Sequence, residues 1–203
     1  LHLQATGDPA VPAELAGWFT ERACHFYLAG LRQSAPLWRL RRSGRAAERT
    51  FAELDAVHAY LREAEGINHV IVSAQGPAAV AAALWCDRRR EDAATGRSPG
   101  SAQTADALIL YRPAWPRGRA LRLDIACPVL MLSADGRGGR LRHRRPAVPQ
   151  QLAGHVTWLQ VPEASASAGL ADLACGAGRR ALLTELGRWL GAYMYGEPPG
   201  RLL

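Results

Sequence analysis

Serine and histidine are the residues of this chain whose side chains could carry out nucleophilic catalysis. An imidazole can take the proton of a serine hydroxyl while the hydroxyl oxygen attacks a carbonyl carbon. Ser73 and Ser133 each end a short apolar stretch. His58 lies in a helical pattern, where we expect it on the helix surface. The other histidines considered open apolar stretches or lie in an arginine-rich segment: His25, His69, His143 and His155. No spacing in the sequence pairs one of these imidazoles with a serine.

The four cysteines have no spacing typical of a metal or redox site. They stand far apart, at Cys24, Cys86, Cys127 and Cys175. None forms a C-x-x-C pair, and no histidine lies at a zinc-ligand offset from them. Cys86 and Cys127 fall in apolar runs, where a thiol packs like a small hydrophobic group. We therefore expect buried thiols in a reducing compartment, with no metal and no cofactor.

The positive charge of the chain comes from arginine alone. The 25 basic and 18 acidic side chains leave a formal net charge of +7, and the sequence contains no lysine. Arginines cluster at 39–45, at 88–90 where we expect a helix to end, and at 137–145. No aromatic residues interleave with these clusters, as a base-stacking surface would require. We therefore favour a solvated basic surface over nucleic-acid binding, and an arginine-driven anion or nucleic-acid binder stays as an alternative.

The length and hydropathy of the chain limit the number of domains and the class of protein. The chain has 203 residues, 48% hydrophobic and 21% charged, which suits one domain spanning 1–203. No apolar run approaches the roughly 20 residues of a membrane-spanning helix. The N-terminus has no basic start followed by an apolar run, which a secretory signal would have. These features predict a cytoplasmic protein without a membrane span.

Short apolar and β-branched stretches alternate with helical patterns along the chain. The predicted strands are Leu1–Ala5, His25–Leu31, His69–Ser73, Ala107–Tyr111, Pro128–Ser133 and His155–Val161. Several are apolar almost throughout, which is typical of parallel strands covered on both faces. Strand–helix–strand alternation of this kind predicts an α/β fold with a doubly wound, mostly parallel sheet.

Four helices are predicted between and after these strands. The first begins at Pro12, and the second begins at a capping box of Thr50 and Glu53 and ends at Gly66. The third begins at Pro77 and runs through Trp85, and the last covers about 179–193. Two polar segments rich in Gly, Ser, Arg or Pro, 92–104 and 136–150, are predicted to be flexible loops.

The order and spacing of these segments resemble the α/β-hydrolases, most closely the serine aminopeptidase / lysophospholipase-like branch. Similar stretches cover nearly the whole chain: FTERACHFYLAGLR (19–32), ELDAVHAYLREAEGINHVIVSAQGPAAVAAALW (53–85), LDIACPVLMLSADG (123–136), HVTWLQVPEASAS (155–167) and ELGRWLGAY (185–193). The resemblance implies a single three-layer domain, truncated at its N-terminus, without the family's first two strands and cap. The strand at His25–Leu31 would then form an exposed sheet edge.

The resemblance also implies where a catalytic site would lie. The family places its nucleophile in G-x-S-x-G, on a sharp turn between a strand and a helix. The corresponding turn here includes Ser73, Gln75 and Gly76, with Gln75 at the nucleophile position. A carboxamide has no oxygen that becomes a nucleophile when an imidazole removes a proton. The position of the catalytic histidine falls near Ala166, and Asp135 could mark the acid.

These departures predict an α/β-hydrolase family protein that lacks the Ser-His-Asp machinery, a non-catalytic or decayed relative of serine ester and peptide hydrolases. The alternative is an active serine hydrolase of esterase, lysophospholipase or aminopeptidase type with a rearranged site, in which Ser73 would be the nucleophile. Whether the protein is an enzyme therefore stays open at this point. The partners considered are a small ester or peptide ligand and a second copy bound at the exposed edge strand.

Overall fold

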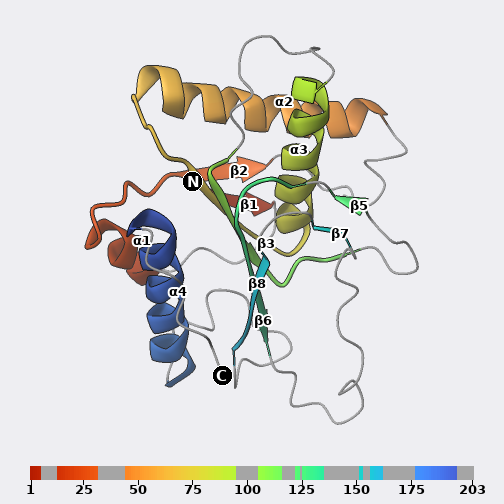
Figure 1. The fold of residues 1–203 in the computed structure, drawn as a ribbon. Helices are drawn as coiled ribbons and strands as arrows, with labels where there is room; N and C mark the ends of the chain where they lie inside the picture. Colours follow the sequence, from red (N-terminus) through yellow and green to blue (C-terminus); the bar gives the residue numbers. More distant parts are fainter. Residues whose placement is uncertain are drawn as a thin grey trace, which may run out of the picture.

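The protein is an α/β structure built on a parallel sheet of six strands (Figure 1). The computed structural model describes residues 1–5, 13–31, 44–94, 105–115, 122–123, 125–134, 151–152, 156–161 and 177–195. The strands of the main sheet are β1 (His2–Ala5), β2 (Leu28–Leu31), β3 (Ile71–Gln75), β4 (Ala107–Tyr111), β6 (Val129–Ala134) and β8 (Val156–Val161). Their spatial order is β2-β1-β3-β4-β6-β8, and every neighbouring pair is parallel.

Four α-helices, a π-helical turn and two short strands complete the described elements. The helices are α1 (Ala13–Thr20), α2 (Gly44–Ala59), α3 (Gly76–Ala94) and α4 (Ala177–Tyr195). A π-helical turn, η2 (Tyr60–Ala64), follows α2 directly. The short strands β5 (Arg122–Leu123) and β7 (Gln151–Leu152) pair in parallel as a separate small sheet.

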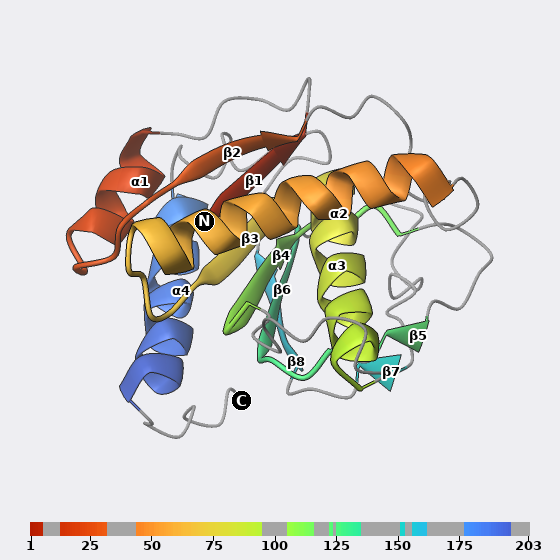
Figure 2. The same ribbon diagram turned by 90° about the horizontal axis from the view of Figure 1, so that it is seen from above.

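The main sheet separates two hydrophobic cores. One core lies against α2 and α3 and includes Leu54, Val72 and Leu108. The other lies against α1 and α4 and includes Trp18 and Leu186. Figures 1 and 2 show the two helix pairs on opposite faces of the sheet. The architecture is therefore three layers, helices–sheet–helices, as the alternation of strands and helices predicts.

Strand β4 shows why the apolar stretches become central strands. All five of its residues are buried. Leu108 and Leu110 enter the α2/α3 core, whereas Ala107, Ile109 and Tyr111 enter the α1/α4 core. Because side chains alternate between the faces of a strand, only a strand covered on both sides can bury a continuous apolar run. The other predicted strands of the sheet also form, with ends that differ by one to three residues.

The second helix begins earlier than its sequence signal predicts. Thr50 is fully buried inside α2, which begins at Gly44, so the predicted capping box at Thr50 and Glu53 is wrong. Ala47 continues the buried stripe of Phe51 and Leu54 by one turn, and this burial extends the helix past the capping signal. The predicted end is confirmed, because Gly66 follows the π-helical turn with a φ of +65°.

The third helix is longer than predicted. It extends from Gly76 to Ala94, so residues 92–94 are helical and the predicted flexible loop at 92–104 is wrong in that part. The arginines at 88–90 accordingly lie within the helix and not at its end. The Arg, Glu, Asp and Ala residues there include good helix formers, and they lack the Gly and Pro of the following stretch. Residues 95–104 and the second predicted loop, 136–150, lie outside the described residues.

Strand β2 ends one side of the sheet, next to β1, as Figure 2 shows. Its position agrees with the edge strand expected at His25–Leu31. At the other end lies β8, which pairs with β6 over six residues of each strand. Within the described part of the chain, no helix has both the length and the apolar character needed to cross a membrane.

Candidate functional site

The turn that the sequence singles out joins β3 to α3 without an intervening loop. Strand β3 ends at Gln75 and α3 begins at Gly76. Gly76 has a φ of +53°, and a Cβ built on it would meet no atom within 4 Å. Its backbone conformation, not crowding, therefore favours glycine at this position. A sharp strand-to-helix turn is present, and it lies at the carboxyl end of β3.

This turn lies where the chain reverses its direction across the sheet. Strand β1 is flanked by β2 on one side and β3 on the other, so the chain passes from one side of β1 to the other between β2 and β3. In open α/β sheets, the crevice outside the carboxyl ends of such strands is the usual ligand position. The carboxyl ends of β1 and β3 are therefore the place where fold geometry alone predicts a site.

The end of β4 and the residues directly after it contact the turn. Gln75 is the register partner of Tyr111, and the backbone N–H of Ala114 donates to the carbonyl oxygen of Gly76 at 3.0 Å. Arg112, directly after β4, has a φ of +42°, and its N–H donates to Leu132 O at 2.9 Å. A non-glycine residue in this region is strained, and such strain is often found near functional sites.

The side chain at the apex of the turn does not provide a nucleophile. Val72 and Ala74 enter the α2/α3 core, so Ser73 and Gln75 lie on the opposite face of β3. Gln75 occupies the last strand position, directly before the left-handed Gly76. The structure thus places Gln75 and Gly76 at the turn, with a carboxamide at its apex, and Ser73 two residues earlier within β3.

Ser73 contacts an imidazole to which the sequence analysis assigned no role. His2 of β1 and Ser73 of β3 are register partners, and 2.8 Å separates His2 Nδ1 from Ser73 Oγ. The His2 ring stacks on Phe26 with 6.1 Å between ring centroids, and only 2% of the residue is exposed. Burial lowers the pKa of His2 to about 4. The ring is therefore neutral at pH 7 and can accept the Ser73 proton.

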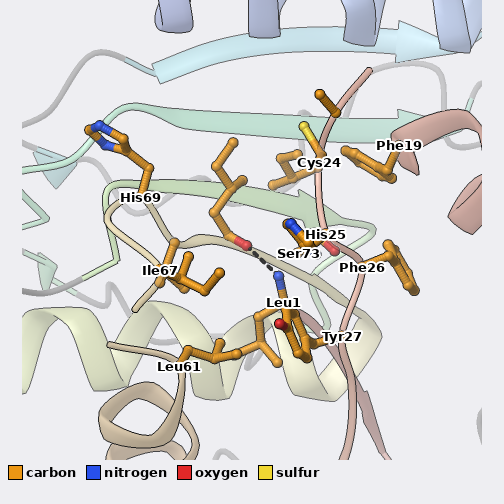
Figure 3. Close-up of a pocket in the computed structure, with 14 residues that line it drawn as sticks. Leu1, Phe19, Cys24, His25, Phe26, Tyr27, Leu61, Ile67, His69 and Ser73 are labelled. Carbon is orange, nitrogen blue, oxygen red and sulfur yellow. Dashed lines mark hydrogen bonds between the residues drawn. The ribbon is translucent and has the colours of Figure 1, made fainter. Parts of the chain in front are cut away.

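A pocket of about 210 Å³ opens beside Ser73, on the amino side of the sheet. Figure 3 shows it around Leu1, with Leu61 and Tyr27 on one side and Cys24 and Phe19 on the other. The backbone nitrogen of Leu1 donates to Ile71 O at 2.9 Å, which holds the start of β1 against β3. The remaining lining residues are mostly apolar: Ala23, His25, Phe26, Ile67, His69, Val70, Ile71 and Ile109.

An ion pair braces the segment that leads into β3. Arg62 of the π-helical turn bonds Asp106, with 2.5 Å between Nη2 and Oδ2, and also donates to Asn68 O. The same carboxylate oxygen of Asp106 accepts the N–H of Val70 at 2.7 Å. These contacts join η2, the start of β3 and the residue before β4. They fix the strand that carries Ser73 and Gln75.

Ser73 and His2 form only part of a hydrolase site. A general base works best when its pKa lies near the operating pH, and a pKa of about 4 makes His2 a weak base. The backbone N–H of Ser73 donates to Leu1 O at 2.8 Å, so it cannot also stabilise an oxyanion. The Ser73 hydroxyl, which lines the pocket, is therefore better placed to bind a polar group there than to be activated by His2.

Of the other candidate residues named from the sequence, the structure describes His58 and Ser133. His58, expected on a helix surface, is 2% exposed and packs edge-on against Trp85, with 5.6 Å between ring centroids, so that expectation is wrong. His58 lies on the side of α2 that faces α3, and the sequence pattern does not reveal that contact. Ser133 lies on β6, in register with Gln160 of β8. The other named positions fall outside the described residues: Asp135, His143, His155 and Ala166.

The described cysteines form no disulfide. Cys86 and Cys127 are buried, as expected, and Cys24 is half-buried. Cys175 lies outside the described residues. Across the described ranges, no three His, Cys, Asp or Glu side chains gather closely enough to hold a metal ion. Of the arginine clusters, the described Arg88 lies over the Phe51 ring, with 5.3 Å from Cζ to the ring centroid.

The signal for the His2–Ser73 pair exists only in the tertiary structure. The two residues are 71 positions apart, and neither lies in a motif that links them. They meet because β1 lies beside β3 in a parallel register. Comparison with known proteins adds no further assignment: no protein-family model and no curated protein matches the chain.

Proposed function

We propose that this protein is a non-catalytic relative of the α/β-hydrolases, which binds a small ester or peptide ligand without hydrolysing it. The carboxamide of Gln75 at the apex of the β3–α3 turn carries this proposal. A hydrolase of this class needs an oxygen nucleophile there, next to a base and to oxyanion donors. The turn between β3 and α3 is sharp, with Gly76 at a φ of +53°, and Gln75 before it offers no oxygen nucleophile.

The arrangement of the fold supports the relationship. The order β2-β1-β3-β4-β6-β8 agrees with the order that the resemblance implies for a chain without the family's first two strands. The placement of α2 and α3 on one face, with α1 and α4 on the other, agrees with the helix and strand segments matched in the sequence. Fold alone does not establish function, and the proposal therefore depends on the turn.

The ligand is limited by the size and lining of the amino-side pocket, which Ser73 lines and Gln75 does not. A volume of about 210 Å³ lies below the roughly 300–1,000 Å³ typical of sites for drug-sized molecules. The walls are mainly aliphatic and aromatic, and the Ser73 hydroxyl offers a polar contact. A short acyl chain or a single apolar side chain with one carbonyl group would suit this combination.

A fluorophosphonate probe and short-chain p-nitrophenyl esters test the absence of catalysis. We expect no covalent labelling and no turnover above buffer, both for the natural chain and for Gln75→Ser. The variant supplies a hydroxyl at the apex, but no imidazole of the described residues is placed to take its proton. Activity gained by Gln75→Ser, and lost again when Asp135 is also changed to Asn, would show that the catalytic acid and base are present and would overturn the proposal.

The second candidate is a serine hydrolase that uses Ser73, and the 2.8 Å contact between His2 Nδ1 and Ser73 Oγ favours it. Ser73 also lines the pocket, so a bound carbonyl could approach its hydroxyl. This candidate predicts labelling of the natural chain that vanishes in Ser73→Ala, falls strongly in His2→Asn and survives in Gln75→Ala. Ser133→Ala is the matched control, because it removes a hydroxyl from another strand of the same sheet.

A further inference from the structure

Within the described residues, the backbone groups at alternate positions on the outer edge of β2 have no partner. The N–H of His2 donates to Tyr27 O at 2.7 Å, and His2 and Leu28 are register partners. In a parallel pair, alternate residues direct their backbone groups to the same neighbour, so Tyr27 and Ala29 face β1. The backbone groups of Leu28 and Gly30 therefore point away from the sheet. These are also the exposed residues of the strand.

Among the described residues, this edge lacks the features by which proteins usually protect sheet edges. Those features are charged side chains, proline, bulges or a covering segment. The strand reads Leu-Ala-Gly-Leu, without charge or proline, and it pairs with β1 in an unbroken register. Within the described part of the chain, no strand pairs with its outer side. Leu28 is 56% exposed. Among the described residues, Tyr60 is the one other large hydrophobic residue that is exposed.

The side chains of β2 are complementary to a second, antiparallel β2. Tyr27 and Ala29 pack towards the α2/α3 core, so Leu28 and Gly30 share the opposite face. In a two-fold pairing centred on Ala29, each Leu28 lies opposite the partner's Gly30, and the two copies of Ala29 face each other. A Cβ at Gly30 would meet no atom within 4 Å, so the space above it can accept a leucine.

We propose that two copies of this chain associate by antiparallel pairing of their β2 edges, about a two-fold axis at Ala29. The N–H and C=O groups of Leu28 and Gly30 then bond those of Gly30 and Leu28 in the partner copy, and the exposed leucines become covered. Such an interface is isologous, so each β2 edge is occupied by the one partner and the pairing closes at two copies. The inference does not depend on the proposed function.

The charge distribution favours a second copy of this chain at the β2 edge over a charged partner. The segment 24–31 contains no Asp, Glu or Arg, so it offers no charge that an acidic or basic peptide could recognise. Two whole chains, each with a formal charge of +7, repel one another at a distance. Salt screens that repulsion and leaves the uncharged edge unaffected. Association should therefore strengthen with salt, whereas arginine-driven binding to nucleic acid should weaken.

Analytical ultracentrifugation over a concentration series, at about 50 mM and about 500 mM salt, tests the association. We expect a monomer–dimer equilibrium that is tighter at high salt. Leu28→Lys should weaken the dimer at least about tenfold, because a lysine on an edge strand opposes pairing. Ala52→Lys, on an exposed position of α2, adds the same charge away from the edge and is the matched control. A monomer under all conditions, or a dimer insensitive to Leu28→Lys, would overturn the proposal.

A cysteine at the two-fold axis tests the register. In a background with Cys24 and Cys175 changed to serine, Ala29→Cys should form a disulfide dimer under a mild thiol oxidant. The facing pair at a non-hydrogen-bonded position has Cα atoms about 4.5 Å apart, which suits a disulfide. Gly30→Cys faces Leu28 of the partner and should cross-link at least about tenfold more slowly. Equal cross-linking of the two variants, or none by Ala29→Cys, would contradict pairing centred on Ala29.

Discussion

Acidification should destabilise the protein through His2. The residue is 2% exposed, and its pKa is lowered from the ordinary 6.5 to about 4. Loss of hydration on burial is the main cause. In the unfolded chain the imidazole regains water and its ordinary pKa. Folding is therefore coupled to the release of a proton between these two values.

The sign and size of the effect follow from proton linkage. Above pH 6.5 the ring is neutral in both states, so His2 causes no pH dependence. Between about pH 6.5 and 4 the unfolded state binds a proton that the folded state does not, so the free energy of unfolding falls as the pH falls. A difference of about 2.5 pKa units, at about 1.4 kcal/mol each, corresponds to about 3.5 kcal/mol in full. About 3 kcal/mol of this is lost by about pH 4, because the folded state is then itself half protonated.

Urea unfolding at a series of pH values, followed by tryptophan fluorescence, measures this loss. The natural chain should lose about 3 kcal/mol more than His2→Asn between about pH 7 and 4. Asparagine places a neutral polar group near the former Nδ1, so the variant stays able to contact Ser73 without titrating. Ser73→Ala is the control, because it removes the hydroxyl, at a cost of about 1 kcal/mol, and leaves the buried imidazole in place.

A parallel loss of stability in the natural chain and in His2→Asn would refute the reasoning. It would mean that His2 is hydrated or already charged in the folded state, in conflict with its burial against Phe26 and its contact with Ser73. A smaller pH dependence in Ser73→Ala than in the natural chain would show that the hydroxyl, and not burial, keeps the ring neutral.

Three further predictions concern stability, each measured by the midpoint of urea unfolding against a matched variant. Gly66→Ala should destabilise by about 1–2 kcal/mol, because Gly66 has a φ of +65°. Gly17→Ala is the matched variant, because Gly17 lies in the interior of α1 with open space for a Cβ. It should instead stabilise the protein by up to about 1 kcal/mol. If both variants shift the urea midpoint in the same direction, backbone conformation is not the cause of the Gly66→Ala effect. Leu110→Ala should cost about 2–5 kcal/mol, because the side chain is fully buried, whereas Leu28→Ala at the exposed edge should change the stability of the monomer little. Asp106→Ala should cost about 1–3 kcal/mol more than Asp106→Asn, because only the amide can still accept the N–H of Val70 and contact Arg62. Equal losses would show that neither hydrogen bond contributes.

The apolar strands and the order of elements could be read from the sequence because their signals are local. The run at Ala107–Tyr111 is apolar at every position, and only a strand buried on both faces accommodates that pattern. Gly66 ended the second helix as predicted, because a left-handed residue there needs no long-range contact to favour glycine. The absence of a nucleophile at Gln75 was visible for the same reason, since the turn is encoded by consecutive residues.

Tertiary structure decided the features that join distant segments. His2 meets Ser73 across 71 positions because β1 and β3 are neighbours, and the register between parallel strands has no local signature. Burial of Ala47 and Thr50 against the core moved the start of α2 ahead of its capping signal, and packing against Trp85 buried His58. Local propensity amounts to tenths of a kcal/mol per residue, whereas burial of a side chain contributes several times more. Where the two conflict, packing determines the structure.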